Sequence, residues 1–233
     1  MAGFFFSKII RYGVFGLIAV VLAQWYLANK SYTINAKDFR RLAEANAADF
    51  SLPSGGPRLI KEFRRIYYTH IISDGDMQWI PIQAGGFSAR ILMLHASLTE
   101  YLAIVHFPVT TGGSTGMHLA NQSCILLSGK MSRFPTTFWV APQARAESLT
   151  PGKNARQYMF ESGLINVEAD TTMLCYGRGI VPSMAPYLTL NSWLSLDPIS
   201  PIRLYGLYAK AAFFETLAAV KETAAQLQRK YLG

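Results

Sequence analysis

Charged side chains are scarce in this chain of 233 residues, and acidic ones are the scarcer kind. Asp, Glu, Lys and Arg together make up 15%, against roughly 25% in an ordinary soluble domain. Apolar residues reach 51%, which excludes a disordered chain and provides ample material for a core. The 22 basic and 14 acidic residues give a net charge of +8. Because no Lys/Arg block occurs and the basic residues flank apolar segments, this excess favours lipid, and we expect no nucleic-acid partner.

Cysteine and closely spaced histidine are also nearly absent. Two cysteines, Cys124 and Cys175, exclude a disulfide-rich scaffold and an all-cysteine zinc site, and they allow at most one bridge. None of the four histidines stands within ten residues of another, so no HxH or HExxH pair exists, and we expect neither metal nor cofactor. The glycine-rich run 112–116 lacks the Lys-Ser/Thr of a phosphate loop and is typical of a hairpin loop. No G-x-S-x-G elbow or dinucleotide fingerprint is present.

The N-terminal segment has the composition of a membrane anchor. Residues 12–28 carry no charge, Lys8 and Arg11 precede them, and Trp25 and Tyr26 lie near their end. With the apolar residues ahead of it, the run reaches the roughly 20 residues that cross a bilayer, with its basic end on the cytoplasmic or matrix side. A cleaved signal peptide has the same order of basic and apolar residues, and a transit peptide is a further alternative. Since Met1 is part of the chain, we expect a retained single-span anchor.

The rest of the chain changes its periodicity twice. Helical patterns over 37–49 and 58–68 flank a predicted turn at 53–57, and helical patterns return at 183–194 and from about 198 toward 232. On the last helix we expect one apolar face made of Tyr205, Ala209, Phe213, Val220, Leu227 and Tyr231. Between these regions short β-rich runs follow one another at 78–83, 87–95, 98–107, 124–127, 136–140, 157–161 and 172–176. Such spacing predicts a jelly-roll sandwich or barrel rather than a parallel α/β sheet.

Several motifs then resemble one known family. The longest are Leu94-His95-Ala96-Ser97-Leu98-Thr99-Glu100-Tyr101 and Tyr176-Gly177-Arg178-Gly179-Ile180-Val181-Pro182-Ser183. Shorter ones are Met77-Gln78-Trp79, Ala84-Gly85-Gly86-Phe87, Leu127-Ser128-Gly129 and Pro151-Gly152. In this order they resemble the family of the sigma-1 receptor and the fungal sterol delta-eight to delta-seven isomerases, over nearly the whole chain.

The resemblance implies a mainly β fold with added helices and a domain plan. We expect a transmembrane anchor at 1–30, a helical connector at 31–76, a cupin-like jelly-roll β-barrel at 77–182, and two C-terminal membrane-associated amphipathic helices at 183–233. The barrel would enclose an elongated apolar ligand cavity. In the family, two acids inside it protonate and deprotonate the sterol or bind an ammonium group.

This chain departs from the family at both acidic positions. The resemblance puts Cys124 at the first and Cys175 at the second, so we expect no catalytic residue, no sterol isomerisation and weak binding of cationic amphiphiles. It also implies that Tyr101, Phe87 and Gln157 line the cavity; Phe87 stands where the family has Trp, and Lys153 replaces a Glu. We expect the two cysteines to be buried free thiols, because carboxyl groups meet across a wider gap than thiols bridge. A disulfide is the alternative.

Three functions follow from these observations. The leading hypothesis is a non-catalytic accessory subunit of a membrane protein assembly, with membrane lipid and other subunits or copies of itself as partners, since barrel motifs persist where catalytic acids are lost. The second is a receptor-like protein that binds a sterol or lipid in its apolar cavity. An active sterol isomerase ranks last. The resemblance favours the endoplasmic reticulum membrane, and the mitochondrial inner membrane is the alternative for a subunit.

Overall fold

The computed structural model describes residues 2–47, 49–136 and 146–232, and the chain divides into two units, Met1–Thr33 and Ile34–Gly233. The first unit consists mainly of helix α1 (Ala2–Asn29). Its segment Arg11–Asn29 is 19 residues long and has no buried residues. Among the described residues, this is the single helix long and apolar enough to cross a membrane. That it does so stays a prediction.

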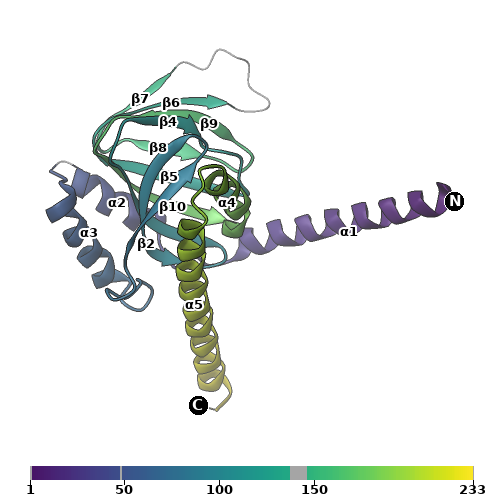
Figure 1. Cartoon of the computed structure of the whole chain (residues 1–233). Coiled ribbons are helices and arrows are strands. Elements are labelled where there is room, and N and C mark those ends of the chain that lie inside the picture. The colour runs from purple at the N-terminus through teal and green to yellow at the C-terminus, as the bar shows by residue number, and fades with distance from the viewer. Residues whose placement is uncertain (1, 48, 137–145, 233) are drawn as a thin grey trace. The chain divides into compact units, whose positions relative to one another are not determined.

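The second unit is built on two antiparallel sheets (Figure 1). Sheet A has the strand order β1-β2-β3-β10-β5-β8, and sheet B has the order β4-β9-β6-β7. The strands of sheet A are β1 (Trp79–Ala84), β2 (Phe87–Ala96), β3 (Glu100–Phe107), β5 (Ala120–Ser128), β8 (Asn154–Gln157) and β10 (Thr171–Gly179). Those of sheet B are β4 (Thr111–Ser114), β6 (Met131–Thr136), β7 (Glu147–Leu149) and β9 (Ser162–Val167). The expected fold class, a cupin-like jelly roll with added helices, is confirmed.

The central strands of sheet A are covered on both faces. On β10, the side chains of Met173 and Cys175 belong to a core inside the barrel, whereas Leu174 and Tyr176 belong to a core beneath α2 and α3. Successive residues of a strand point to opposite faces. Because both faces are buried, the strand is a continuous apolar run, which is why the sequence signal is strong here.

Helices α2 (Ala36–Ala47) and α3 (Leu52–Ile66) provide the outer cover. Phe39 of α2 and Leu59 and Phe63 of α3 are buried in the same core as Leu174. The expected turn at 53–57 is wrong, since α3 already begins at Leu52. Pro53 stands in the first turn of this helix, where its missing N–H and fixed φ are compatible with helix, and burial of Leu59 and Phe63 stabilises the remainder.

The strand predictions hold best in sheet A. The runs expected at 78–83, 87–95, 98–107, 124–127 and 172–176 all fall on its strands. The run expected at 157–161 is wrong beyond Gln157, and the run at 136–140 lies mostly outside the described residues. Gly112–Ser114, expected in a loop, belongs to β4, and β7 and β9 were missed because they are short and partly exposed.

A tight hairpin joins β1 to β2 at a motif quoted above. Ala84 pairs with Phe87, and the two residues between them, Gly85 and Gly86, both have positive φ, at 57° and 100°. Such a two-residue turn requires this left-handed backbone, which glycine adopts without steric cost. The glycine pair therefore fixes the register in which Phe87 starts β2.

After the barrel, a 3-10 helix η1 (Val181–Met184) leads into α4 (Ala185–Leu194) and α5 (Ile199–Leu232). The apolar face expected for α5 is not the face that packs in the barrel core, although its members Tyr205 and Ala209 line the cavity. The structure packs Leu204, Leu207, Tyr208, Ala211 and Ala212 against or near the barrel, while Ala209, Phe213 and Val220 are exposed. The side chains of Leu227 and Tyr231 are outside the described set. Both stripes have helical spacing, so the sequence alone did not indicate which one the barrel would cover.

Candidate ligand cavity

A cavity of about 420 Å³ lies inside the barrel, within the size range of small-molecule sites. Both sheets line it, and residues of η1, α4 and α5 complete its wall. Most of the lining is aliphatic, aromatic or thioether. Its apolar residues include Ile82, Phe87, Ile91, Met93, Val105, Phe107, Met131, Ile165, Met173, Val181, Met184, Leu188 and Leu204.

The five residues that the resemblance placed at the cavity are brought together there. Cys124, Cys175, Tyr101, Phe87 and Gln157 all line it. Phe87 of β2 packs against Phe107 of β3, with ring centroids 5.9 Å apart. That any of the five contacts a ligand stays a prediction.

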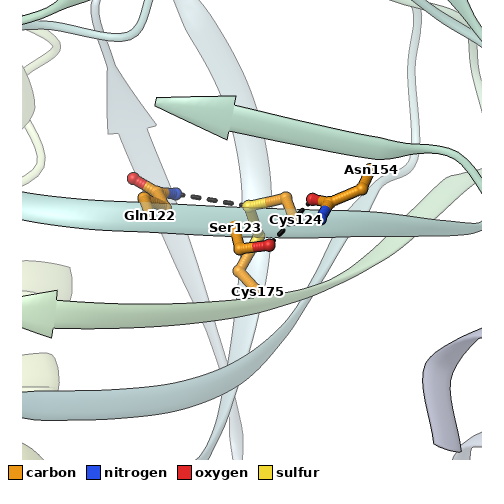
Figure 2. The surroundings of a disulfide bond; sticks show 5 residues. All are labelled: Gln122, Ser123, Cys124, Asn154 and Cys175. Atoms are coloured by element: carbon orange, nitrogen blue, oxygen red, sulfur yellow. Dashed lines mark hydrogen bonds between the residues drawn. A yellow bond between two sulfur atoms is a disulfide. The ribbon is translucent and has the colours of Figure 1, made fainter. Parts of the chain in front are cut away.

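Cys124 and Cys175 form a disulfide, so the expectation of free thiols is wrong (Figure 2). The two residues pair directly across β5 and β10, with Cα atoms 4.1 Å apart. The expectation rests on a backbone gap at these positions too wide for two thiols to bridge. The register shows instead that the positions are cross-strand neighbours on one face, within reach of the short cysteine side chain.

The disulfide lies on the cavity side of sheet A. Gln122, two residues away on the same face, donates an amide N–H to the Sγ atom of Cys124 at 3.3 Å (Figure 2). Ser123 points the other way and donates to the Oδ1 atom of Asn154 at 2.8 Å. Since a disulfide sulfur carries no charge and accepts hydrogen bonds weakly, this wall provides neither a proton donor nor a counter-ion.

A row of polar side chains crosses the sheet beside the disulfide. Tyr101 pairs with Gly177, Gly177 with Gln122, and Gln122 with Gln157, across β3, β10, β5 and β8. A Cβ atom on Gly177 would overlap the ring of Tyr101, and the ring carbon that bears the hydroxyl lies 2.8 Å from that position. The absence of a side chain at Gly177 therefore leaves space for the Tyr101 ring. Burial raises the pKa of the Tyr101 hydroxyl.

Gln157 and His118 close the end of the cavity near α4. The amide nitrogen of Gln157 donates to the carbonyls of Gly116 and Glu161, both at 2.8 Å. The Nε2 atom of His118 lies 2.8 Å from the Thr115 carbonyl, and its ring packs edge-on against Tyr187. Burial lowers the pKa of His118, with the Thr115 carbonyl acting against that shift. His118 is thus held neutral in this wall.

Charge in the cavity lining is of one sign. Among the described residues that line it there is no Asp or Glu, while Arg133 of β6 and Arg156 of β8 are present. Arg133, Gln122 and His118 were not predicted as site residues. Arg133 could have been found from its position two residues after Met131, which places both side chains on one face of a strand. The sequence did not reveal where this strand, β6, begins.

Tyr176, Arg178 and Glu100, which belong to the two longest motifs, have a structural role on the other face of sheet A. The hydroxyl of Tyr176 donates to Glu100 Oε2 at 2.9 Å and lies 2.8 Å from the Ile34 carbonyl. Arg178 donates to the Tyr176 hydroxyl and to the Ile34 carbonyl at 2.6 and 2.8 Å, and the Ile34 N–H approaches Glu100 at 3.3 Å. These residues fasten the start of the second unit to sheet A and lie away from the cavity.

The fold and the cavity define a class: jelly-roll proteins with an apolar ligand cavity whose wall is completed by C-terminal helices. The family described as "ERG2 and Sigma1 receptor like protein" matches residues 9–219, and the chain belongs to this family. It is 32% identical to "Sigma non-opioid intracellular receptor 1" of Gallus gallus over 213 residues, covering 88% of this chain and 92% of that one.

Two further proteins are similar to this chain. The protein of the same description from Taricha granulosa is 29% identical over 207 residues, 88% of this chain and 90% of that one. Among solved structures, an RmlC-like cupin from Shewanella frigidimarina matches with a TM-score of 0.39 and 12% identity, over 47% of this chain and 90% of that chain.

Proposed function

We propose that this protein is a non-catalytic, receptor-like member of its family that binds a lipid or sterol in the barrel cavity. The observation that carries the proposal is the uncharged disulfide between Cys124 and Cys175 in the wall of an apolar cavity, at the positions where the resemblance places the family's acidic pair. Binding of an apolar molecule needs the cavity and its walls. Isomerisation needs an acid and a base, which these residues do not provide.

A proton-transfer role for other residues finds little support. Tyr101 is buried with a raised pKa, and His118 is buried with a lowered one. A phenol that holds its proton tightly is a poor acid toward an alkene, and a neutral imidazole is a weak one. The lining therefore suits recognition rather than chemistry.

The outer face of the C-terminal helices supports contact with a membrane, from which a lipid would reach the cavity. Trp193 is 64% exposed and Leu194 83% exposed at the end of α4, and Ile202 is 70% exposed near the start of α5. Large exposed apolar patches mark lipid or protein contacts. The other exposed apolar residues of this region are Leu190, Leu196, Ile199, Phe213, Phe214, Leu217 and Val220.

The test is recovery of the native ligand. We expect extraction of the protein purified from its native membrane to yield one lipid or sterol species in near-stoichiometric amount. Ala155→Phe, which fills the cavity from β8, should lose that species, and Ala45→Phe on the exposed face of α2 should retain it. Equal recovery from both variants, or no enrichment over bulk membrane lipid, would contradict the proposal.

A role as accessory subunit remains a second proposal, favoured by one further observation. Phe134 of β6 and Leu164 of β9 pair side by side on sheet B, and they are 41% and 52% exposed. An exposed apolar pair suits a protein partner. Proteins that co-migrate with the native chain but not with the Phe134→Ser, Leu164→Ser variant would support this role, and a chain that migrates alone in both cases would exclude it.

A further inference from the structure

Arg133 is a buried cation in the wall of the apolar cavity. Arg133 is only 8% exposed, it lines the cavity, and it lies on the same face of β6 as the buried Met131, two residues away. Arginine remains charged at any physiological pH and carries five N–H donors. A charge in such a place is expected to have a partner of opposite sign, because an uncompensated buried ion costs several kcal/mol.

The described residues supply only a neutral partner. One guanidinium nitrogen of Arg133 donates to the backbone carbonyl of Arg156. This hydrogen bond joins β6 of sheet B to β8, the edge strand of sheet A. Glu147 is its cross-strand neighbour on β7, but it is exposed, and no ion pair joins the two within the described part of the chain. Most of the donors of Arg133 thus lack a protein acceptor among these residues.

The groups that could balance this charge from within the cavity are also absent from its described lining. No Asp or Glu faces Arg133 there, and the cysteines that replace the family's acids are joined in an uncharged disulfide. A cavity with two ionised carboxyls carries negative charge, whereas the described lining of this cavity carries positive charge. Such a site repels an ammonium and attracts an anion.

We propose that the cavity takes an anionic amphiphile, a long-chain carboxylate, whose head group pairs with Arg133. The guanidinium fork binds a carboxylate through two parallel hydrogen bonds, and the hydrocarbon chain lies along the apolar wall that includes Met131, Ile165 and Met173. This inference rests on the proposed function, which requires only that the cavity binds a lipid or sterol. It adds the charge of the head group and the residue that recognises it.

The polar row of sheet A offers a competing head-group position. Tyr101 and Gln122 could bind a neutral hydroxyl, since their side chains line the same cavity beside the disulfide. These groups are neutral, so they do not balance the charge of Arg133. A neutral alcohol therefore serves as the discriminating probe.

The experiment measures binding of three probes with one chain length to the full chain in a neutral detergent. Radiolabelled palmitate, 1-hexadecanol and hexadecylammonium are titrated onto immobilised protein at alkaline pH, where palmitate is ionised. The variants are Arg133→Leu, which fits an apolar wall, Arg133→Lys, which keeps the charge but not the fork, and Arg65→Leu on the exposed face of α3 as the matched control. Thermal unfolding of each variant shows that it is folded.

We expect palmitate to bind about tenfold or more tightly than 1-hexadecanol, and hexadecylammonium to bind most weakly. Arg133→Leu should weaken palmitate binding about 100-fold, the effect of losing hydrogen bonds to a charged group, and leave 1-hexadecanol unchanged. Arg133→Lys should keep part of the preference, and Arg65→Leu all of it. Equal binding of palmitate and 1-hexadecanol, or palmitate binding that Arg133→Leu does not alter, overturns the inference while the proposed function stands. If no probe binds and no lipid is recovered from the native protein, the proposed function fails instead.

Discussion

The hydroxyl of Tyr176 donates a hydrogen bond to the carboxylate of Glu100 at 2.9 Å, on the face of sheet A that α2 covers. Glu100 is fully buried, and the same hydroxyl receives a hydrogen bond from Arg178. A buried carboxylate must be paired and hydrogen-bonded to be tolerated. This contact therefore belongs to the stability of the fold rather than to the cavity.

Tyr176→Phe tests that role. The change removes one hydrogen bond to a buried carboxylate and leaves a donor of Arg178 without its acceptor, so we expect the free energy of unfolding to fall by about 2 to 3 kcal/mol. Tyr158→Phe is the matched control, because Tyr158 is exposed. Denaturant unfolding of both variants gives the difference, and an equal effect of the two would show that the Tyr176 hydroxyl contributes nothing.

The disulfide should contribute to stability by limiting the unfolded chain. Its cysteines are 51 residues apart, and closure of a loop of that length is worth about 4 kcal/mol. We expect Cys124→Ala with Cys175→Ala to lower the free energy of unfolding by roughly this amount, compared under non-reducing conditions with the unaltered chain. Alkylation followed by peptide mass analysis checks that the bridge is present in the unaltered protein. Unfolding curves that coincide would show that the cross-link does not stabilise the fold.

Replacing the disulfide by acids should restore affinity for amines. In Cys124→Asp with Cys175→Glu, two carboxyls would face each other across β5 and β10, and we expect hexadecylammonium to bind at least about tenfold more tightly than to the unaltered chain. The variant with serine at both positions is the control, since it removes the bridge without adding charge. If the unaltered chain already binds the amine tightly, the argument from the missing acids is wrong.

Acidification should destabilise the protein partly through His118. Burial lowers the folded-state pKa of this histidine below its unfolded value of about 6.5. The unfolded chain then binds more protons, so the free energy of unfolding falls as the pH falls through 6.5 toward the folded-state pKa. His118→Gln keeps a donor for the Thr115 carbonyl and removes the titration. We expect this variant to lose less stability between about pH 7.5 and about pH 5.5 than the unaltered chain. Identical losses would place the pH sensitivity elsewhere.

Gly177→Ala should displace the ring of Tyr101. The added methyl group would overlap that ring, which is buried and would have to shift. We expect a loss of about 1 to 3 kcal/mol in the free energy of unfolding and weaker ligand binding. In a Tyr101→Ala background the same glycine change should cost much less, because the overlap is gone. An additive effect of the two changes would show that the ring and the glycine do not interact.

The sequence predicted the parts of the fold where pattern and burial coincide. Sheet A strands such as β3 and β10 are buried on both faces and carry apolar runs. The resemblance identified five residues that all line the cavity. The sequence did not reveal β7 and β9 of sheet B, because both are short and partly exposed. Arg133 was missed because β6 was not recognised from its start at Met131. The state of the cysteines depended on register. Strand pairing decides whether two residues 51 positions apart lie directly opposite each other. Local sequence patterns do not predict this pairing.

The disulfide also restricts how the barrel can open. Cys124 and Cys175 join β5 to β10 covalently at the middle of sheet A, so these two strands cannot separate to admit a molecule. The wall formed by α4 and α5 is held without a covalent bond. Leu204 and Leu207 pack in the barrel core, the Tyr208 hydroxyl donates to the Ser97 carbonyl, and Lys210 donates to Asp76, each at 2.6 Å. Under the proposed function we therefore expect a lipid to enter between the barrel and helices α4 and α5, because the disulfide holds β5 and β10 together.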